Sequence, residues 1–413
     1  MRYLILALSL LLSTNCYAAG VTRAYSDGVI HAKPTGTALI PIGALTITAQ
    51  ASVDRTVLVN GNTKGSEPDR FDRPTCVQRD DGVWVMVYRA GTHHYLEQAN
   101  DVVHIRFLKP DGTWTADDTC LDNSAVSGLP SEATPGDALG PSDPTIIKAP
   151  NGDLLLHTWD VDYGVSNNGT WQTRSTDGGE TWGTWGKIDF VGRSDDAHIF
   201  AAEDFFLYNG SIYLIARYFT SASNANNGGL FIKSDDNGVS WNYVSTVLAH
   251  TFEGDGCTEY SLEWLGGNRL VSILRDYSNY YTWVTFSDNF GGTWDTPTRI
   301  DNGDLGANLY RARTYTDSHL KGRANWQNDP LIINNGFSNS TPGTSLPYRR
   351  PGISLSADRC LNLTSVQYVD NQSYDAGYGD LFYDHANNKY GFVVYYGDSA
   401  KSDIVQYKFE VQW

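Results

Sequence analysis

The sequence predicts an all-β fold built from one unit that recurs along the chain, and three observations support this. Strand-like apolar runs alternate with turns containing Gly or Asn over most of the chain. Gly, Trp and Tyr are abundant, with 40, 12 and 25 copies in 413 residues, and long amphipathic helical stretches are not evident. A turn pattern ending in Trp occurs three times, which is typical of repeat architectures.

The repeated turn has a simple chemical logic. Its full copies are Ser175-Thr-Asp-Gly-Gly-Glu-Thr-Trp182, Ser234-Asp-Asp-Asn-Gly-Val-Ser-Trp241 and Ser287-Asp-Asn-Phe-Gly-Gly-Thr-Trp294, and Asp111-Gly-Thr-Trp114 retains only the end. The four Trp residues are separated by 68, 59 and 53 residues. Asp or Asn accepts hydrogen bonds from the turn backbone, Gly adopts positive φ, and we expect Trp to anchor the turn against its own blade.

This pattern resembles the Asp box of sialidases and related β-propellers. The resemblance implies a six-bladed β-propeller, with seven blades possible, that occupies residues 20–413 as one domain. Asp boxes lie away from the catalytic face in that family and also occur in propellers with other activities. The turns therefore predict the fold, and function has to be inferred from other residues.

Five apolar runs that follow Gly- or Asn-containing turns are expected to be inner or middle strands of successive blades. They are Gly82–Tyr88, Gly152–His157, Ser211–Ala216, Arg269–Leu274 and Tyr390–Tyr396. Strand candidates in residues 20–60 are expected to close the ring by pairing with Ile404–Phe409. Residues 316–347 are rich in Asn, Gly, Ser and Pro and predict a long loop.

The N-terminus predicts secretion. Arg2, the apolar run Leu4–Leu12 and the small residues at Ala18 and Ala19 form the pattern of a signal peptide over residues 1–19, so we expect a secreted or periplasmic protein. A formal charge of −17 argues against nucleic acid and anionic membranes as partners. We expect a monomer that acts on an acidic glycan or glycoconjugate and needs no cofactor.

Four cysteines remain after signal removal, namely Cys76, Cys120, Cys257 and Cys360. In an oxidising compartment an even number favours at least one disulfide, and all three pairings stay open. The irregular spacing argues against a zinc site, and no metal is expected. The segments around His157 and around Glu203 and Asp204 are weaker candidates for pocket lining or calcium binding.

Glu259 and Arg275 are the most informative pair, because a hairpin of 16 residues would bring its two strand ends to one face. The segment resembles the sialidase hairpin in which a Glu begins one strand and a carboxylate-binding Arg ends the next. Without that resemblance, a surface ion pair is the simpler interpretation.

Further resemblances to the family follow in chain order. Arg73, before Pro74, stands where sialidases have their first arginine, and Arg350 matches the third, with Arg349 as the alternative. Tyr378 lies 28 residues after Arg350, in a segment similar to that of the sialidase nucleophile, with Gly379 in place of the usual Ser.

Together these residues suit hydrolysis of a 2-keto acid glycoside, because a carboxylate nucleophile would be repelled by the substrate carboxylate at the anomeric carbon. Tyr378 would attack, Glu259 would act as its base, and Arg73, Arg275 and Arg350 would bind the substrate carboxylate. The resemblance implies a retaining exo-sialidase.

The general acid is less well defined. Residue type favours Asp101, spacing favours Glu97, and His93 and His94 are further candidates. Adjacent histidines keep a second enzyme hypothesis open, a propeller polysaccharide lyase that removes a proton from a uronate by β-elimination. A third hypothesis is a carbohydrate-binding propeller without turnover.

Overall fold

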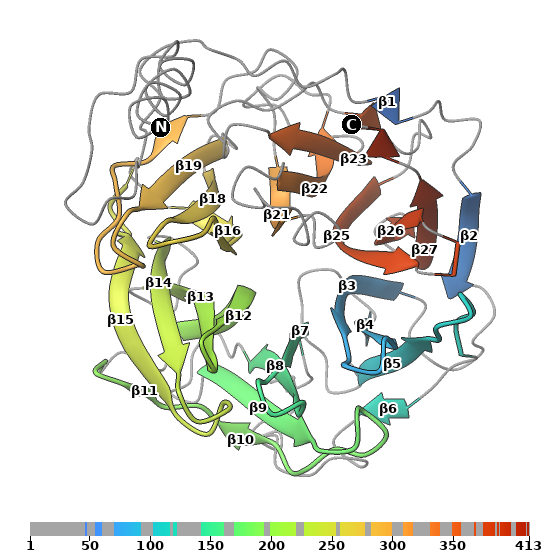
Figure 1. Ribbon diagram of the computed structural model, residues 1–413, viewed down its shortest axis with the longest axis horizontal. Coiled ribbons are helices and arrows are strands. Elements are labelled where there is room, and N and C mark those ends of the chain that lie inside the picture. Colours follow the sequence, from blue (N-terminus) through green and yellow to red (C-terminus); the bar gives the residue numbers. More distant parts are fainter. Residues whose placement is uncertain are drawn as a thin grey trace, which may run out of the picture. The chain divides into compact units, whose positions relative to one another are not determined.

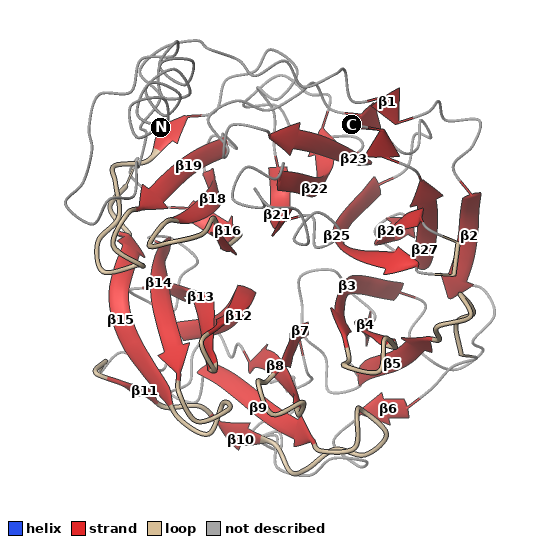
Figure 2. Cartoon of the chain, in the orientation of Figure 1, coloured by secondary structure: helices blue, strands red, loops and turns tan. Residues whose placement is uncertain are grey.

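Strands are the only regular secondary structure among the described residues, as Figure 2 shows. The computed structural model describes residues 46–47, 54–59, 70–91, 102–115, 119–121, 142–160, 169–193, 199–219, 227–252, 257–276, 282–299, 309–316, 331–338, 349–356, 367–368, 375–384, 386–387, 389–397, 402–409 and 411–412. All of these lie within one of the two contact units of the chain, Leu45–Gln412. A helix long and apolar enough to cross a membrane does not occur in this described part.

The first three blades, each named after its innermost strand, are antiparallel meanders (Figure 1). The β3 blade contains β3 (Arg70–Gln78), β4 (Trp84–Gly91), β5 (Val102–Leu108) and β6 (Thr119–Leu121). The β7 blade contains β7 (Ser142–Lys148), β8 (Leu154–Asp160), β9 (Gly169–Ser175) and β10 (Gly186–Lys187). The β12 blade contains β12 (Ile199–Tyr208), β13 (Ser211–Phe219), β14 (Asn227–Ser234) and β15 (Trp241–Leu248), with β11 (Phe190–Val191) parallel to β15.

The remaining blades follow the same plan. The β16 blade contains β16 (Cys257–Tyr260), β17 (Glu263–Trp264), β18 (Leu270–Asp276), β19 (Thr282–Ser287) and β20 (Thr298–Arg299). The β21 blade contains β21 (Leu309–Thr316), β22 (Leu331–Ser338), β23 (Arg349–Ser356) and β24 (Gln367–Tyr368). The β25 blade contains β25 (Asp375–Asp384), β26 (Lys389–Gly397) and β27 (Ser402–Phe409), and β2 (Asp54–Val59) pairs with β27.

The innermost strands meet in a closed circuit, because β3 contacts β7, β7 contacts β12, and so on through β16, β21 and β25 back to β3. The predicted all-β propeller is therefore confirmed. The described strands form five sheets of four or more strands, and one of these, with eight strands, contains both the β25 and the β3 blade. A single parallel pair, Ser402 with Arg70, joins its two halves, so the predicted six units are reached when they are counted separately.

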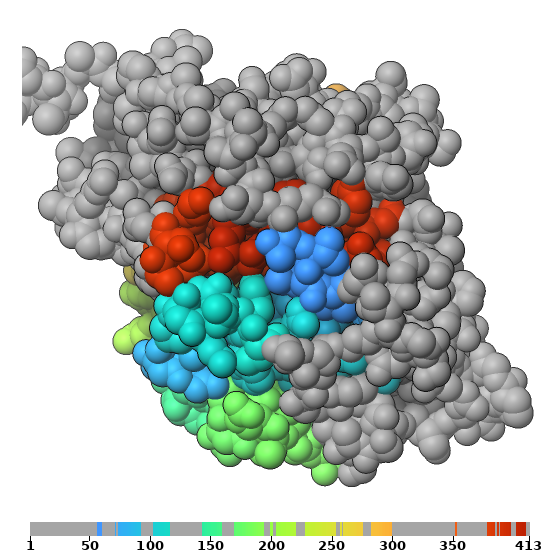
Figure 3. All heavy atoms as spheres, turned by 90° about the vertical axis from the view of Figure 1, so that its right-hand side faces the viewer, coloured from blue at the N-terminus to red at the C-terminus, as the bar shows by residue number. Residues whose placement is uncertain are grey.

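The N-terminal strands complete the ring, as predicted. β2 pairs antiparallel with β27 from Asp54 to Val59, and β1 (Thr46–Ile47) pairs with β28 (Val411–Gln412). The Arg106 guanidinium of β5 also donates a hydrogen bond to the Leu58 carbonyl. Figure 3 shows the blue atoms of β2 between the red C-terminal strands and the cyan atoms of the β3 blade. Strand β2, early in the chain, and strand β27, in its C-terminal part, thus belong to one sheet.

The five predicted strand runs are all second strands of blades, namely β4, β8, β13, β18 and β26. These strands are apolar because they lie between neighbouring sheets; Val85 and Val87 of β4, for example, pack with Ile146 and Leu156 of the β7 blade. The prediction of a continuous loop over residues 316–347 is wrong. Its residues Leu331–Ser338 form β22, which pairs with both β21 and β23, because ladder hydrogen bonds on both sides outweigh the weak strand preference of Asn and Gly.

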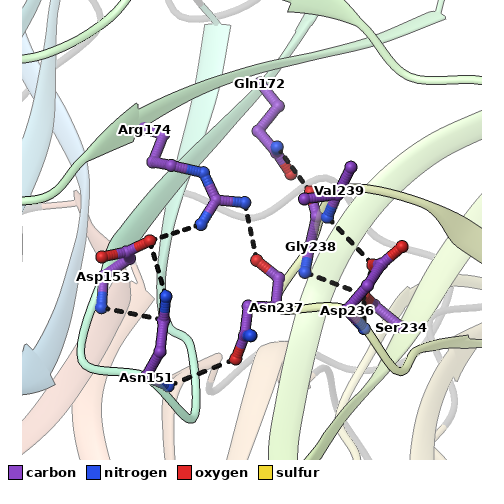
Figure 4. A network of polar contacts seen from close by, with 9 residues as sticks. All are labelled: Asn151, Asp153, Gln172, Arg174, Ser234, Asp236, Asn237, Gly238 and Val239. Atoms are coloured by element: carbon purple, nitrogen blue, oxygen red, sulfur yellow. Dashed lines mark hydrogen bonds and ion pairs between the residues drawn. The ribbon is translucent and has the colours of Figure 1, made fainter.

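Each repeated turn lies between the third and fourth strands of its blade and is closed as its chemistry predicts. In the turn Ser234–Trp241, the Ser234 hydroxyl accepts from the Gly238 N–H at 2.8 Å, and Asp236 accepts from the Ser240 N–H at 2.9 Å. Figure 4 shows how the preceding blade holds this turn. Arg174 donates to the Asn237 carbonyl at 2.6 Å, and Gln172 donates to the Gly238 carbonyl at 2.8 Å.

We expected each Trp to anchor its turn against its own blade, but in three of the four turns the Trp also binds the preceding blade. The indole N–H groups of Trp114, Trp241 and Trp294 donate to the preceding blade, and their acceptors are Gln406, Gln172 and Ser245, respectively. The indole is long enough to cross the gap between sheets, and its N–H needs an acceptor once it is covered. These turns therefore connect blades.

Candidate functional site

The register shifts in all six innermost strands, and four of these shifts contain a non-glycine residue with positive φ. These four shifts fall between Asp72 and Thr75, Ser142 and Thr145, Thr258 and Tyr260, and Gly377 and Asp380. The bulges contain Arg73, Asp143, Glu259 and Tyr378, whose φ angles are 54°, 47°, 60° and 45°. A β-bulge turns a side chain away from the regular alternation of its strand, and non-glycine residues in this region of φ are uncommon. Four charged or phenolic side chains are thus redirected at one level of the propeller.

Glu259 links a tyrosine and an arginine. The Tyr378 hydroxyl donates to Glu259 Oε1 at 2.8 Å, and Arg275 Nη1 donates to Glu259 Oε2 at 2.8 Å. Tyr378 and Glu259 each expose only 8% of their surface, so this Tyr–Glu–Arg chain is largely shielded from water. The pairing of Thr258 with Arg275 explains why the hairpin brings the arginine back to the glutamate.

The carboxyl of Glu259 is held in its charged form. Burial alone would raise its pKa, but the charge and hydrogen bond of Arg275, the Tyr378 hydroxyl and the charge of Arg217 together lower it to about 2. Glu259 is therefore a carboxylate at any ordinary pH. An ionised acceptor 2.8 Å from a phenol can receive the phenolic proton.

Arg73 covers the other side of the tyrosine. Its guanidinium carbon lies 5.1 Å from the centroid of the Tyr378 ring, and it forms an ion pair with Asp143. Tyr395 stacks on Tyr378 with ring centroids 6.0 Å apart. The phenol ring therefore has Arg73 and Tyr395 as neighbours, and its hydroxyl is bound by Glu259, an arrangement that limits its motion.

Buried polar residues just after three of the bulges bind the neighbouring blade. Asp380 accepts from the Cys76 N–H at 2.7 Å, and the Thr75 hydroxyl donates to the Pro144 carbonyl at 3.3 Å. Asp204 accepts from the Leu262 N–H at 3.0 Å. Asp204 is therefore a buried inter-blade acceptor, and this geometry does not support the earlier calcium-site interpretation for it. The bulged residues are held in place by these contacts between blades.

His157 also has a structural position. It is buried, hydrogen-bonds to Gln172 at 2.8 Å and packs edge-on against Trp241 at 5.2 Å between centroids. Burial lowers its pKa to about 4, so the ring stays neutral. It belongs to the packing between the β7 and β12 blades. Among the side chains that the structure describes, no group of three His, Cys, Asp or Glu could hold a metal ion.

Of the six predicted site residues, Tyr378, Glu259, Arg275 and Arg73 come together. Asp101, the expected acid, and its alternatives Glu97, His93 and His94 lie outside the described residues. For Arg349 and Arg350 only the backbone is described; they begin β23 and pair with Ser338 and Phe337. The predicted roles of these residues stay predictions, as does the disulfide.

Sequence reasoning missed Asp143, whose ion pair with Arg73 places it in the site. A signal was present, because Asp143-Pro144 has the same form as Arg73-Pro74 at the start of the preceding blade's inner strand. A charged residue directly before Pro in an inner strand marks both of these bulges. Asp143 is recognised only once the two blades are aligned.

Comparisons with known proteins identify relatives of the fold. No protein-family model and no curated protein matches the sequence. A solved structure from Dyadobacter fermentans, described as of unknown function, is 14% identical with a TM-score of 0.63, and the alignment covers 87% of this chain and 98% of that one. A Hadza microbial sialidase is 14% identical with a TM-score of 0.61, covering 86% and 68%. Trypanosoma rangeli sialidase is 13% identical with a TM-score of 0.58, covering 86% of this chain and 59% of its own length. Sialidases are thus among the structural neighbours. At identities this low, the structural likeness shows a shared fold alone.

Proposed function

We propose that this chain is a secreted exo-glycosidase that hydrolyses terminal, α-ketosidically linked sialic acid or a related ulosonic acid with retention of configuration. The observation that supports it most directly is the Tyr378–Glu259–Arg275 hydrogen-bond chain, buried at the bulges of the β16 and β25 blades. The presence of sialidases among the structural neighbours is consistent with it.

In the proposed reaction the Tyr378 oxygen attacks the anomeric carbon while its proton moves to Glu259 Oε1. The bond to the leaving group breaks, and the departing oxygen takes a proton from the general acid, for which Asp101 is our candidate. Water then attacks the anomeric carbon of the tyrosyl intermediate, and its proton returns through the same acid, now a base. The tyrosine recovers its proton from Glu259, so the enzyme ends as it began.

The difference in pKa between Glu259 and a phenol bears on when the proton moves in the proposed reaction. Transfer of the proton from a free phenol, whose ordinary pKa is about 10, to a carboxylate with a pKa of about 2 is strongly unfavourable. The proton must therefore move as the new C–O bond forms. Arg275 has several N–H donors, so it can keep Glu259 in place while it contacts a substrate carboxylate. Arg73 and Arg350 are proposed to bind the same carboxylate.

The test uses a fluorogenic aryl N-acetylneuraminic glycoside and, in parallel, uronate polysaccharides. Wild type should release the aryl alcohol, and Tyr378→Phe should lose about a hundredfold to ten-thousandfold in kcat because the nucleophile is gone. Tyr395→Phe is the matched control, since it removes a hydroxyl from the stacked neighbour and should keep most of the activity. Unsaturated product from a uronate would indicate a lyase instead, and silence on both would favour an untested ulosonic acid or a binding propeller.

A further inference from the structure

Arg217 occupies the same register position in the β12 blade as Arg275 in the β16 blade. Arg217, in β13, pairs with Phe200 at the last position before the shift between Phe200 and Asp204. Arg275, in β18, pairs with Thr258 at the last position before the shift between Thr258 and Tyr260. The two arginines therefore start from corresponding levels of adjacent blades.

Arg217 is also close to the site in space. β16, which carries Glu259, contacts both β12 and β13. The charge of Arg217 is one of the influences that lower the pKa of Glu259. A charge that acts on this buried carboxylate also acts on a ligand placed beside it.

The guanidinium of Arg217 lies against a pair of aromatic rings. Its central carbon lies 5.4 Å from the Phe200 ring centroid and 5.2 Å from that of Phe219. The two rings meet edge to face at 4.5 Å and are both buried. A guanidinium stacked on buried rings loses little further freedom when it binds oxygen atoms through its N–H groups.

The site residues Arg73, Asp143, Arg217, Glu259 and Arg275 carry a summed charge of +1 in a chain of net charge −17.

We propose that Arg217 is a further substrate-binding residue, which holds an oxygen acceptor group on the sugar other than the carboxylate assigned to Arg73 and Arg275. The acceptor is a second anionic group, such as a sulfate, or an acyl carbonyl. The inference rests on the proposed function and narrows its substrate class to acidic sugars that carry such a second group.

The test measures binding as well as turnover, so the two proposals can fail separately. Calorimetry would compare three free acids: N-acetylneuraminic acid, its analogue with hydroxyl in place of the N-acyl group, and an O-sulfated N-acetylneuraminic acid. Wild type should bind at least one substituted acid more tightly than the hydroxyl analogue. Arg217→Met, which keeps the apolar stem over the rings, should remove about tenfold to a hundredfold of that preference, as expected for charge-assisted hydrogen bonds. Arg217→Lys should restore part of it.

Arg193→Met is the matched control. The guanidinium carbon of Arg193 lies 5.1 Å from the ring centroids of both Tyr218 and Tyr243, so Arg193 is another arginine that contacts two rings. Its loss should leave the preference for the substituted acids unchanged. Melting temperatures of all variants check folding. Whichever acid loses its advantage in Arg217→Met identifies the acceptor group. Equal weakening of all three acids, an unchanged preference, or no binding by wild type would overturn the inference. An Arg217-dependent preference without hydrolysis of the fluorogenic aryl N-acetylneuraminic glycoside would count against the proposed hydrolysis of N-acetylneuraminic acid and would leave the binding role of Arg217 standing.

Discussion

The inner bulges and the outer turns solve the same backbone problem in opposite ways. Both need left-handed φ angles. At the bulges these fall on Arg73, Asp143, Glu259 and Tyr378. The outer turns instead use Gly178, Gly238 and Gly291, at 79°, 80° and 81°, and in two of the turns the residue directly before the glycine is also left-handed, Asn237 at 59° and Phe290 at 57°. Left-handed backbone is nearly free for glycine and costs about 1–3 kcal/mol for other residues.

The difference shows where the molecule needs side chains. At the bulges a charged or phenolic group must be presented, so the strained backbone is retained and supported by ion pairs and inter-blade hydrogen bonds. At the glycine positions of two of these turns a side chain does not fit. A Cβ at Gly238 would lie 2.2 Å from Leu155 Cδ1, and one at Gly291 would lie 2.1 Å from Phe231 Cε1. Left-handed charged or phenolic residues at the inner end of the blades thus belong to the candidate site, whereas the glycines at the outer end allow close packing.

The largest effect is expected at an inner bulge. Glu259→Gln keeps the size of the side chain but cannot accept the Tyr378 proton as a carboxylate does. If the proposed function holds, kcat should fall by about a hundredfold to ten-thousandfold while the protein stays folded. Steady-state kinetics and circular dichroism would check this, with the exposed Glu180→Gln as control. Activity near wild type would remove Glu259 from the mechanism.

A substitution in an outer turn should lower stability and leave activity unchanged. Gly238→Ala should lower the free energy of unfolding by about 2–4 kcal/mol, because positive φ and overlap with Leu155 add together. The activity per folded molecule should not change. Gly210→Ala has a similar φ of 78° and open space around its Cβ, so it should lose only about 1 kcal/mol. Equal losses in urea unfolding would show that the space around the turn does not matter.

The free energy of unfolding should depend on pH more strongly through the inner-bulge residue Glu259 than through an outer-turn carboxylate. The pKa of Glu259 is lowered from 4.5 to about 2, so its stabilisation is fully present above pH 4.5 and is lost as the pH falls to about 2. This contribution is on the order of 3 kcal/mol. The stability gap between wild type and Glu259→Gln should therefore shrink from pH 5 to pH 2.

The control for this pH dependence is Asp177 in an outer turn. Its pKa also falls to about 2: burial works against the shift, and hydrogen bonds from Thr181 and Ser175 produce it. Because Asp177 is exposed, solvent screens its charge, and Asp177→Asn should change the pH dependence by less than about 1 kcal/mol. Unfolding in urea at several pH values would measure both. A larger effect for Asp177 would reverse the comparison.

The smallest effect is expected where an outer turn joins two blades. Trp294→Phe keeps an aromatic ring, although a smaller one, and removes the indole hydrogen bond to the Ser245 hydroxyl, 3.2 Å away. The loss should be about 1 kcal/mol, and Ser245→Ala should be less than additive with it. A double-mutant cycle in urea would test the contact. Full additivity would mean that the hydrogen bond does not couple the blades.

Local sequence was enough to predict the repeated turns, the second strands and the closure by β2, because each depends on turn chemistry or strand periodicity within a few residues. The pairing of Glu259 with Arg275 was also foreseeable, since one hairpin contains both. The contact of Tyr378 with Glu259, 119 residues apart, was expected only from the resemblance to sialidases. Asp101 and the side chain of Arg350 lie outside the described residues, so that part of the predicted site has no structural account.

By itself, then, the sequence determined an all-β repeat with glycine-based outer turns, because hydrogen bonds inside one turn do not depend on the rest of the chain. Only the tertiary structure decided which blades share side chains. Asp143 forms an ion pair with Arg73, and Arg217 takes the position in its blade that Arg275 takes in the next. Asp204 accepts a hydrogen bond from Leu262, and three Trp indoles bind the preceding blade. These contacts arise where sheets meet face to face, and the order of residues along one strand does not specify what the next sheet presents.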